Sequence, residues 1–255
     1  MNVSTIKHYN EPMNEHVVEY NTKIKKFPDG TEKLKYHTYS SIKGLYRKGK
    51  GNSSPTSESK KKDNLYASKQ RLIDLVYCNA IDEPWEYFVT LTFNPEKVDS
   101  FCYNDVVCAM HKWLDNLKHQ NKKLKYILVP ELHKSGRIHI HGLFKNCPNL
   151  KLVDSGKRKK GIIIYNLTNY KYGYTTVSEV QNQEAVSVYV SKYMTKDLIK
   201  ISGKNTYWCS KGLLRPQIEY AQFNESTLSF YIENYEIKDM FKSENTTSIF
   251  YKIIY

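Results

Sequence analysis

Residues 126–144 read YILVPELHKSGRIHIHGLF, and this stretch decides the fold. Two apolar runs flank a Lys-Ser-Gly segment at 134–136. This pattern predicts two antiparallel strands joined by a three-residue turn, with glycine in the left-handed position. A turn of that length places Glu131 directly opposite His139 across the strand pair, whereas a two-residue turn would move Glu131 to the other face.

Two histidines flank one apolar residue in the second strand of this hairpin. Side chains alternate along a strand, so we expect His139 and His141 to share a face with Glu131, while Ile140 points into the core. Two imidazoles and a carboxylate form a three-point cation site with open positions, which suits Mn²⁺ or Mg²⁺. His133 also shares this face, at the edge of the turn, and is a competing ligand.

The segments around the hairpin alternate between helical and strand patterns, which indicates an α+β protein. The apolar spacing predicts helices over 64–80 and 103–119 and a third helix that starts at Ser178. Strands are predicted over 87–93, 161–165 and 172–177. In the third helix Val186, Val190 and Met194 form the buried stripe.

A neighbouring stripe of that third helix carries tyrosine and lysine. Tyr189 and Tyr193 lie one helical turn apart, which by default describes two surface side chains that pack on each other. Beside a metal-binding strand they become candidate nucleophiles for a phosphodiester. A phenol has a pKa near 10 and needs a nearby cation, and Lys192 and Lys196 each lie one turn from a tyrosine.

The charge of the chain points to a polyanionic partner. Of 255 residues, 39 are Lys or Arg against 26 Asp or Glu, a formal net charge of +13. Nucleic acid is the simplest such partner, and 22 tyrosines suit stacking on unpaired bases. A basic loop at Lys157, Arg158, Lys159 and Lys160 is a candidate phosphate contact. We expect a cytoplasmic protein, because no signal peptide or membrane span is evident in the sequence.

Three segments in order resemble the motifs of HUH endonucleases, specifically the rolling-circle replication initiators of bacteriophages and bacterial plasmids. They are FVTLTF at 88–93, VPE at 129–131 leading to RIHIHGL at 137–143, and YVSKYMTKD at 189–197. YWCSKGL at 207–213 also resembles a segment that follows the nucleophile helix in this family. The resemblance covers residues 64–217, between a basic N-terminal arm at 1–63 and a C-terminal extension at 218–255.

This resemblance implies a ferredoxin-like antiparallel sheet with helices packed on one face. It implies metal-dependent nicking and rejoining of single-stranded DNA at an origin in a bacterial cell, with host helicase and polymerase as partners. Tyr193 matches the position of the single nucleophile in the family, and tyrosine at 189 as well resembles the two-tyrosine arrangement. Arg137, beside the histidine strand, and the 157–160 run are the expected DNA contacts.

Three alternatives remain open from the sequence. The first is a related enzyme, a single-strand transposase or a mobilisation relaxase, although relaxases usually carry an N-terminal tyrosine. The second is a non-catalytic binder of single-stranded DNA or RNA with a structural ion. The third is an iron oxygenase with two histidines and one carboxylate, which fits the basic charge poorly.

Overall fold

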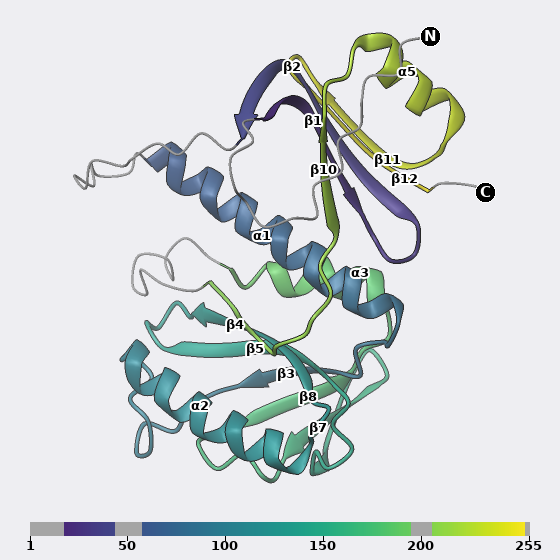
Figure 1. Ribbon diagram of the computed structural model, residues 1–255. Coiled ribbons are helices and arrows are strands. Elements are labelled where there is room, and N and C mark those ends of the chain that lie inside the picture. Colours follow the sequence, from purple (N-terminus) through teal and green to yellow (C-terminus); the bar gives the residue numbers. More distant parts are fainter. Residues whose placement is uncertain (1–17, 44–57, 195–205, 253–255) are drawn as a thin grey trace. The chain divides into compact units, whose positions relative to one another are not determined.

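The computed structural model of the protein describes residues 18–43, 58–194 and 206–252. The chain forms two compact units (Figure 1). The larger unit comprises Pro55–Leu214, and the smaller unit combines Met1–Ser54 with Arg215–Tyr255. The larger unit contains the His-Ile-His hairpin.

The larger unit is built on a seven-stranded antiparallel sheet with the order β6-β7-β8-β3-β5-β4-β9. β5, which carries the two histidines, lies between β3 and β4. The strands of this sheet are β3 (Tyr87–Leu91), β4 (Lys125–Leu132), β5 (Ile138–Lys145), β6 (Leu152–Lys159), β7 (Ile162–Leu167), β8 (Thr175–Glu179) and β9 (Trp208–Cys209). The predicted hairpin is thus confirmed as β4 and β5.

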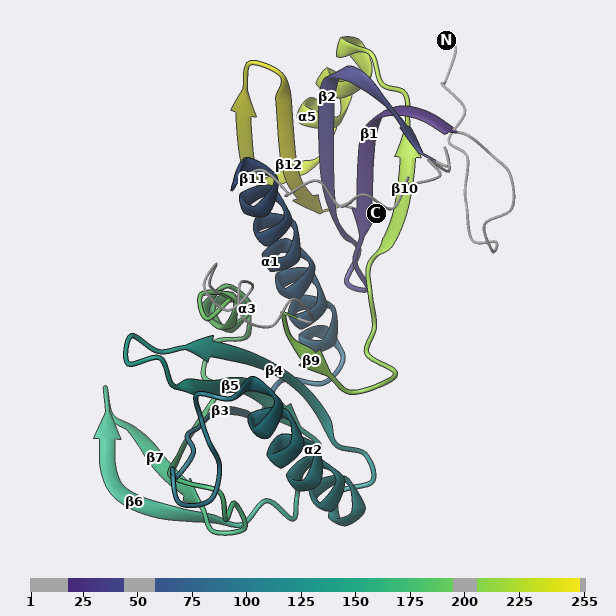
Figure 2. The ribbon, with the colours of Figure 1, turned by 90° about the vertical axis from the view of Figure 1, so that its left-hand side faces the viewer.

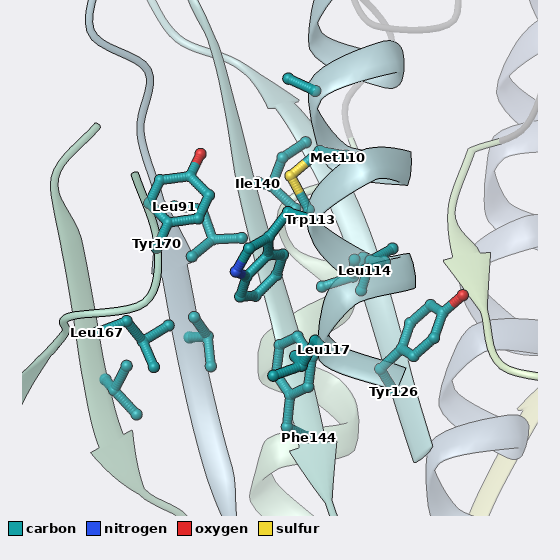
Figure 3. Close-up of a cluster of buried hydrophobic side chains, with 14 of the residues drawn as sticks. Leu91, Met110, Trp113, Leu114, Leu117, Tyr126, Ile140, Phe144, Leu167 and Tyr170 are labelled. Atoms are coloured by element: carbon teal, nitrogen blue, oxygen red, sulfur yellow. The ribbon is translucent and has the colours of Figure 1, made fainter. Parts of the chain in front are cut away.

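One face of this sheet is covered by α2 (Tyr103–Gln120). Its apolar stripe matches the prediction, and Figure 3 shows Met110, Trp113 and Leu117 pointing from the helix toward the strands. The Trp113 ring meets Phe144 of β5 edge-on, with ring centroids 5.9 Å apart. Ile140 is fully buried on this face, as expected for the residue between the two histidines.

The opposite face is covered by α1 (Glu58–Ile81) and α3 (Gln183–Ser191), as Figures 1 and 2 show. Leu72 of α1 and Val190 of α3 are fully buried in the same apolar cluster as Leu143 of β5. This face is the one to which His139 and His141 belong, because residues two apart along a strand lie on the same side.

The α+β class and the antiparallel sheet are confirmed, and the architecture is compatible with a ferredoxin-like fold with extensions. The expectation that helices pack on one face differs from the structure, where helices cover both. The physical reason lies in β4, where Ile127, Leu128 and Val129 are consecutive and all fully buried. A strand with an uninterrupted buried run needs cover on both faces.

α3 begins later than the sequence predicts. Ser178, the predicted start, is in β8 and pairs with Phe88 of β3. The helix is instead capped by Asn182, whose side-chain oxygen accepts a hydrogen bond at 2.8 Å from the backbone N–H of Ala185. Pairing with β3 therefore keeps residues 175–179 extended, and the helix can start only after them.

The buried stripe predicted for this helix is confirmed. Val186, Val190 and Met194 are 7%, 0% and 1% exposed. α3 itself ends at Ser191, and a tighter turn follows, in which the N–H of Tyr193 bonds to the carbonyl of Val190.

The basic run at 157–160 is mostly strand rather than loop. Lys157 and Lys159 belong to β6 and pair with Ile164 and Ile162 of β7. The turn itself is at Lys160 and the following glycine, both with positive φ. The prediction of a loop was wrong because a run of charged residues hides the alternation that marks an exposed edge strand.

The smaller unit is a five-stranded antiparallel sheet with the order β10-β1-β2-β12-β11. Its elements are β1 (Val18–Lys26), β2 (Thr31–Lys43), β10 (Gln217–Ala221), α5 (Glu225–Asn234), β11 (Glu236–Ser243) and β12 (Thr246–Lys252). The sequence divided these segments into an N-terminal arm at 1–63 and a C-terminal extension at 218–255. In the structure, strands from the two ends of the chain pair with each other, and α1 begins inside the segment expected to be the arm.

No helix in the described ranges is long and apolar enough to cross a membrane.

The close approach of β4 and β5 depends on Gly142. We expect Gly142→Ala to lower the free energy of unfolding by about 1–3 kcal/mol. The added Cβ would meet the Leu128 side chain and lie 2.6 Å from the carbonyl oxygen of Ile127, both in the packed centre of the sheet. Urea unfolding measures the decrease. Val153→Ala, on a side chain that is 53% exposed, is the control and should change stability by less than about 0.5 kcal/mol. Equal decreases would contradict the packing argument.

Candidate active site

The turn between β4 and β5 sets the register of the site. The backbone N–H of His133 bonds to the carbonyl of Arg137, and Gly136 has a φ of +83°. Glu131 consequently pairs with His139, and Val129 pairs with His141. The predicted register is confirmed, and Glu131, His139 and His141 lie on the same face of the sheet.

His141 is held at both ring nitrogens. Its Nε2 lies 2.8 Å from Oε2 of Glu131, and its Nδ1 lies 3.1 Å from the hydroxyl of Thr90 on β3. A carboxylate only accepts hydrogen bonds, so Nε2 carries a proton and Nδ1 of the neutral ring accepts from Thr90. Burial lowers the pKa of His141, while the hydrogen bond and charge of Glu131 oppose this.

His139 has a different neighbour. Its ring stacks on His133, with centroids 5.0 Å apart, and His133 in turn lies 3.0 Å from the hydroxyl of Ser135 through Nδ1. Burial lowers the pKa of His139, and the charge of His133 lowers it further. Both lowered pKa values favour neutral imidazole, the form that binds metal ions.

Glu131, His139 and His141 carry ligand atoms that suit a divalent cation, but their side chains do not all converge on one point. Glu131 and His141 touch each other, whereas His139 turns toward His133. Within the described part of the chain, no group of three or more His, Cys, Asp or Glu side chains is already arranged to hold a metal. Nε2 of His141 could bind an ion only in the other neutral tautomer, in which the proton is on Nδ1. Nδ1 would then donate a hydrogen bond to the Thr90 hydroxyl.

Tyr193 lies directly on His141. The two rings are stacked with centroids 3.6 Å apart and planes 14° apart. The Tyr193 hydroxyl donates a 2.8 Å hydrogen bond to the hydroxyl of Tyr189. Burial raises the pKa of Tyr193, and the hydrogen bond to Tyr189 and the charges of Tyr189 and Glu131 raise it further. Without an added cation, Tyr193 is therefore a neutral phenol.

The structure describes the predicted lysine partner of Tyr189 but not that of Tyr193. The Lys192 ammonium lies over the Tyr189 ring, 5.4 Å from its centroid. Lys196, predicted as the partner of Tyr193, falls outside the described residues.

A cavity of about 1020 Å³ adjoins the tyrosines. Tyr189, Lys192 and Tyr193 line one part of it, and Lys157 and Lys159 of β6 line another. Two segments that are about thirty residues apart in the sequence therefore face the same space.

The remaining predicted DNA contacts are spread more widely. Arg158 lines the same cavity, but its guanidinium is paired with Asp154 at 2.8 Å, and the pair is exposed. Lys160 is at the turn after β6 and does not line the cavity. Arg137 is in the other hairpin, with its guanidinium 5.6 Å from the ring centroid of Phe101.

Sequence reasoning missed two residues of β3. Thr90 pairs with His141 in register and bonds to its ring, and Phe88 contacts Tyr189 and Tyr193, with ring centroids 5.1 and 6.0 Å apart. The signal was present, because Phe88 and Thr90 alternate in a strand predicted from its composition. What the sequence did not reveal was that β3 pairs with the histidine strand.

Residues 86–198 match the sequence model of one family, described as replication-associated protein ORF2. The match covers somewhat less than half of the chain and includes β3, the histidine hairpin, β6 to β8 and both tyrosines. No curated protein and no solved structure matched the chain. The family match supports a replication-initiator family and a role in DNA replication.

Proposed function

We propose that this protein nicks and rejoins single-stranded DNA at a replication origin through a phosphotyrosine intermediate, and so starts rolling-circle replication of a phage or plasmid. The observation that carries the proposal is the contact of Tyr193 with His141, whose Nε2 bonds to Glu131. A nucleophile candidate thus lies on a pair of metal-ligand candidates, within a region that matches a replication-associated family.

In the proposed reaction the Tyr193 oxygen attacks the phosphorus of the scissile phosphodiester. The bond from phosphorus to the 3′ oxygen breaks, which leaves a 5′-phosphotyrosine and a free 3′-OH once that oxygen takes a proton. The phenol proton passes to solvent water, because Tyr193 lines an open cavity. A phenolate is also a reasonable leaving group, so the same step in reverse rejoins the strand.

Glu131, His139 and His141 are the residues that would hold the divalent ion. A bound Mg²⁺ or Mn²⁺ would polarise a phosphodiester oxygen and stabilise the negative charge that develops at phosphorus. The protein contributes the positions of these ligands, because the register of β4 and β5 and the Thr90 hydroxyl both orient them. A nearby cation would also lower the cost of ionising Tyr193, which burial otherwise increases.

The test is incubation of the full chain with a panel of labelled single-stranded oligonucleotides from its own replicon in the presence of Mn²⁺. We expect a covalent protein–DNA adduct with a subset of the sequences, resolved on a denaturing gel. Binding to all oligonucleotides without any adduct would instead favour a non-catalytic single-strand binder.

The basic side chains of β6 and of the turn that follows it give a separate prediction. Changing Lys157, Arg158, Lys159 and Lys160 to alanine should weaken DNA binding by a similar factor for every sequence. Phosphate contacts release counterions, so the slope of log affinity against log salt should fall by about 0.7 for each phosphate that is no longer neutralised. Fluorescence anisotropy over a salt series measures both. Retained affinity without origin preference would show that these residues read bases instead.

A further inference from the structure

α3 follows directly from the pairing of two strands. β8 pairs with β3 as far as Glu179. One further hydrogen bond, from the backbone N–H of Val180 to the carbonyl of Glu86, extends this ladder by a residue. The chain then turns into α3, which begins at Gln183. The backbone groups of Trp85, next along the segment that leads into β3, therefore need partners other than a strand.

The side chain of Gln183 continues the ladder where the backbone leaves it. Its Oε1 accepts a 2.9 Å hydrogen bond from the backbone N–H of Trp85, and its Nε2 donates a 2.9 Å hydrogen bond to the carbonyl of the same residue. Only this orientation of the amide satisfies both backbone groups, because the amide oxygen accepts and the amide nitrogen donates. We name these two bonds the Gln183 clamp.

Trp85 is itself held firmly. It is 1% exposed, and its indole N–H donates a 3.0 Å hydrogen bond to the carbonyl of Val76 in α1. It belongs to the apolar cluster in which Val186 and Val190 of α3 are buried. Three residues after Trp85 comes Phe88, whose ring contacts both tyrosines. The same short segment therefore contacts α3 at its start and the tyrosines at the other end of the helix.

Apolar packing alone selects the position of α3 along its axis only weakly. Val186 and Val190 are identical buried side chains one turn apart, and Tyr189 and Tyr193 repeat with the same spacing on the neighbouring stripe. A displacement by one turn puts valine in the place of valine, at a lower cost than in a stripe of unlike side chains. The observed position, in which Tyr193 stacks on His141, therefore depends on contacts beyond the stripe.

We infer that Gln183 is a positioning residue that selects the attacking tyrosine. Its clamp holds α3 where Tyr193, rather than Tyr189, lies on His141. Gln183 touches no reacting atom and acts through the helix. The choice of the attacking tyrosine rests on the proposed nicking reaction, whereas the stacking of Tyr193 on His141 does not. Loss of the clamp lets the helix shift, and Tyr189 then competes for the scissile phosphate.

The first test needs neither metal nor DNA. Protons over the face of an aromatic ring resonate upfield, so the ring protons of His141 report its stacking on Tyr193 in the NMR spectrum of the full chain. Tyr193→Leu gives the resonance positions without that ring. Gln183→Met keeps the length of the side chain and removes both bonds to Trp85. In this variant we expect the His141 resonances to move most of the way to the unstacked positions.

Asn182→Ala is the matched control. It removes the hydrogen bond from the N–H of Ala185 that caps the same end of α3, and it leaves both bonds of the clamp in place. Both variants weaken the helix start, so we expect both to lower the unfolding temperature. The His141 resonances of the control should stay at the parent positions. Equal displacement in the two variants would overturn the inference, because it would assign the effect to fraying of the helix.

The second test identifies the attacking tyrosine. Each protein is incubated with origin oligonucleotide and Mn²⁺, and mass spectrometry of the digested adduct locates the tyrosine that carries DNA. The parent and Asn182→Ala should carry it on Tyr193. In Gln183→Met we expect a substantial share on Tyr189. Its rate of adduct formation at saturating DNA should be about 10–100-fold lower, because small misplacements of reacting groups have effects of that size.

The dependence of the rate on DNA concentration separates positioning from binding. Gln183 does not line the cavity beside the tyrosines, so the DNA concentration that gives the half-maximal rate should stay within about twofold of the parent value. A rise in this concentration with an unchanged maximal rate would overturn the positioning role and assign Gln183 to DNA binding.

Gln183→Glu is the milder variant. It keeps an acceptor for the N–H of Trp85 and loses only the donor to its carbonyl. If Gln183→Met does not fold, both tests are read from this variant, with changes in the same direction. Parent-like His141 resonances, or DNA on Tyr193 alone, in the folded variant would overturn the inference. Absence of any adduct from the parent would instead count against the nicking reaction, and the resonance test would still decide what the clamp does.

Discussion

Tyr193→Phe is expected to abolish the covalent adduct with origin DNA, a loss on the order of a thousandfold or more, while DNA binding stays nearly unchanged. Phenylalanine keeps the ring that stacks on His141 and removes only the hydroxyl. The measurement is a denaturing gel of labelled oligonucleotide after incubation with the variant and Mn²⁺, with anisotropy for binding.

Tyr189→Phe is the matched control, because it removes the other hydroxyl of the same hydrogen bond. It should spare the first nick and, if both tyrosines serve, block the second transfer that releases a finished circle. Full adduct from the Tyr193 variant and none from the Tyr189 variant would reverse the assignment. Adduct from the double variant would exclude both as the nucleophile.

The second large effect is expected at the metal ligands. His141→Gln and Glu131→Gln should each lower Mn²⁺ affinity by more than about 100-fold, since loss of a supporting group alone typically costs about 10–100-fold. Adduct formation should fall with it, and chelation by EDTA should have the same effect on the parent protein. Isothermal titration with Mn²⁺ measures the affinity without any dependence on catalysis.

His133→Gln provides the matched control for the metal site. His133 stacks on His139 and bonds to Ser135, whereas Glu131 bonds to His141, so the variant should bind Mn²⁺ within about tenfold of the parent. If His133→Gln abolished metal binding and Glu131→Gln kept it, His133 would replace Glu131 as the third ligand.

Rules that act within a few residues were enough to predict that Glu131, His139 and His141 share one face of the sheet. The turn at 134–136 fixed the pairing of Glu131 with His139, and strand alternation placed His141 on the same face. Both rules act over a few residues, so no knowledge of the rest of the chain was needed. The buried stripes of α2 and α3 were predictable for the same reason, because helical periodicity is a property of one segment.

What the sequence could not provide were contacts between distant segments. The stacking of Tyr193 on His141, the bond from Thr90 to the same ring, and the cavity shared by β6 and α3 depend on which strands and helices become neighbours. Neither turn chemistry nor periodicity specifies those neighbours.

The smaller unit shows this limit most clearly. β1 pairs with β10, almost two hundred residues later, so the unit exists only once both ends of the chain have met. Taken alone, its segments are short and rich in charge, which is why the sequence suggested an arm and an extension. By itself the sequence determined the hairpin, its register and the faces of the helices, because these follow from steric and periodic rules within one segment. Only the tertiary structure decided the second sheet, because pairing of distant strands is selected by the burial of the whole unit.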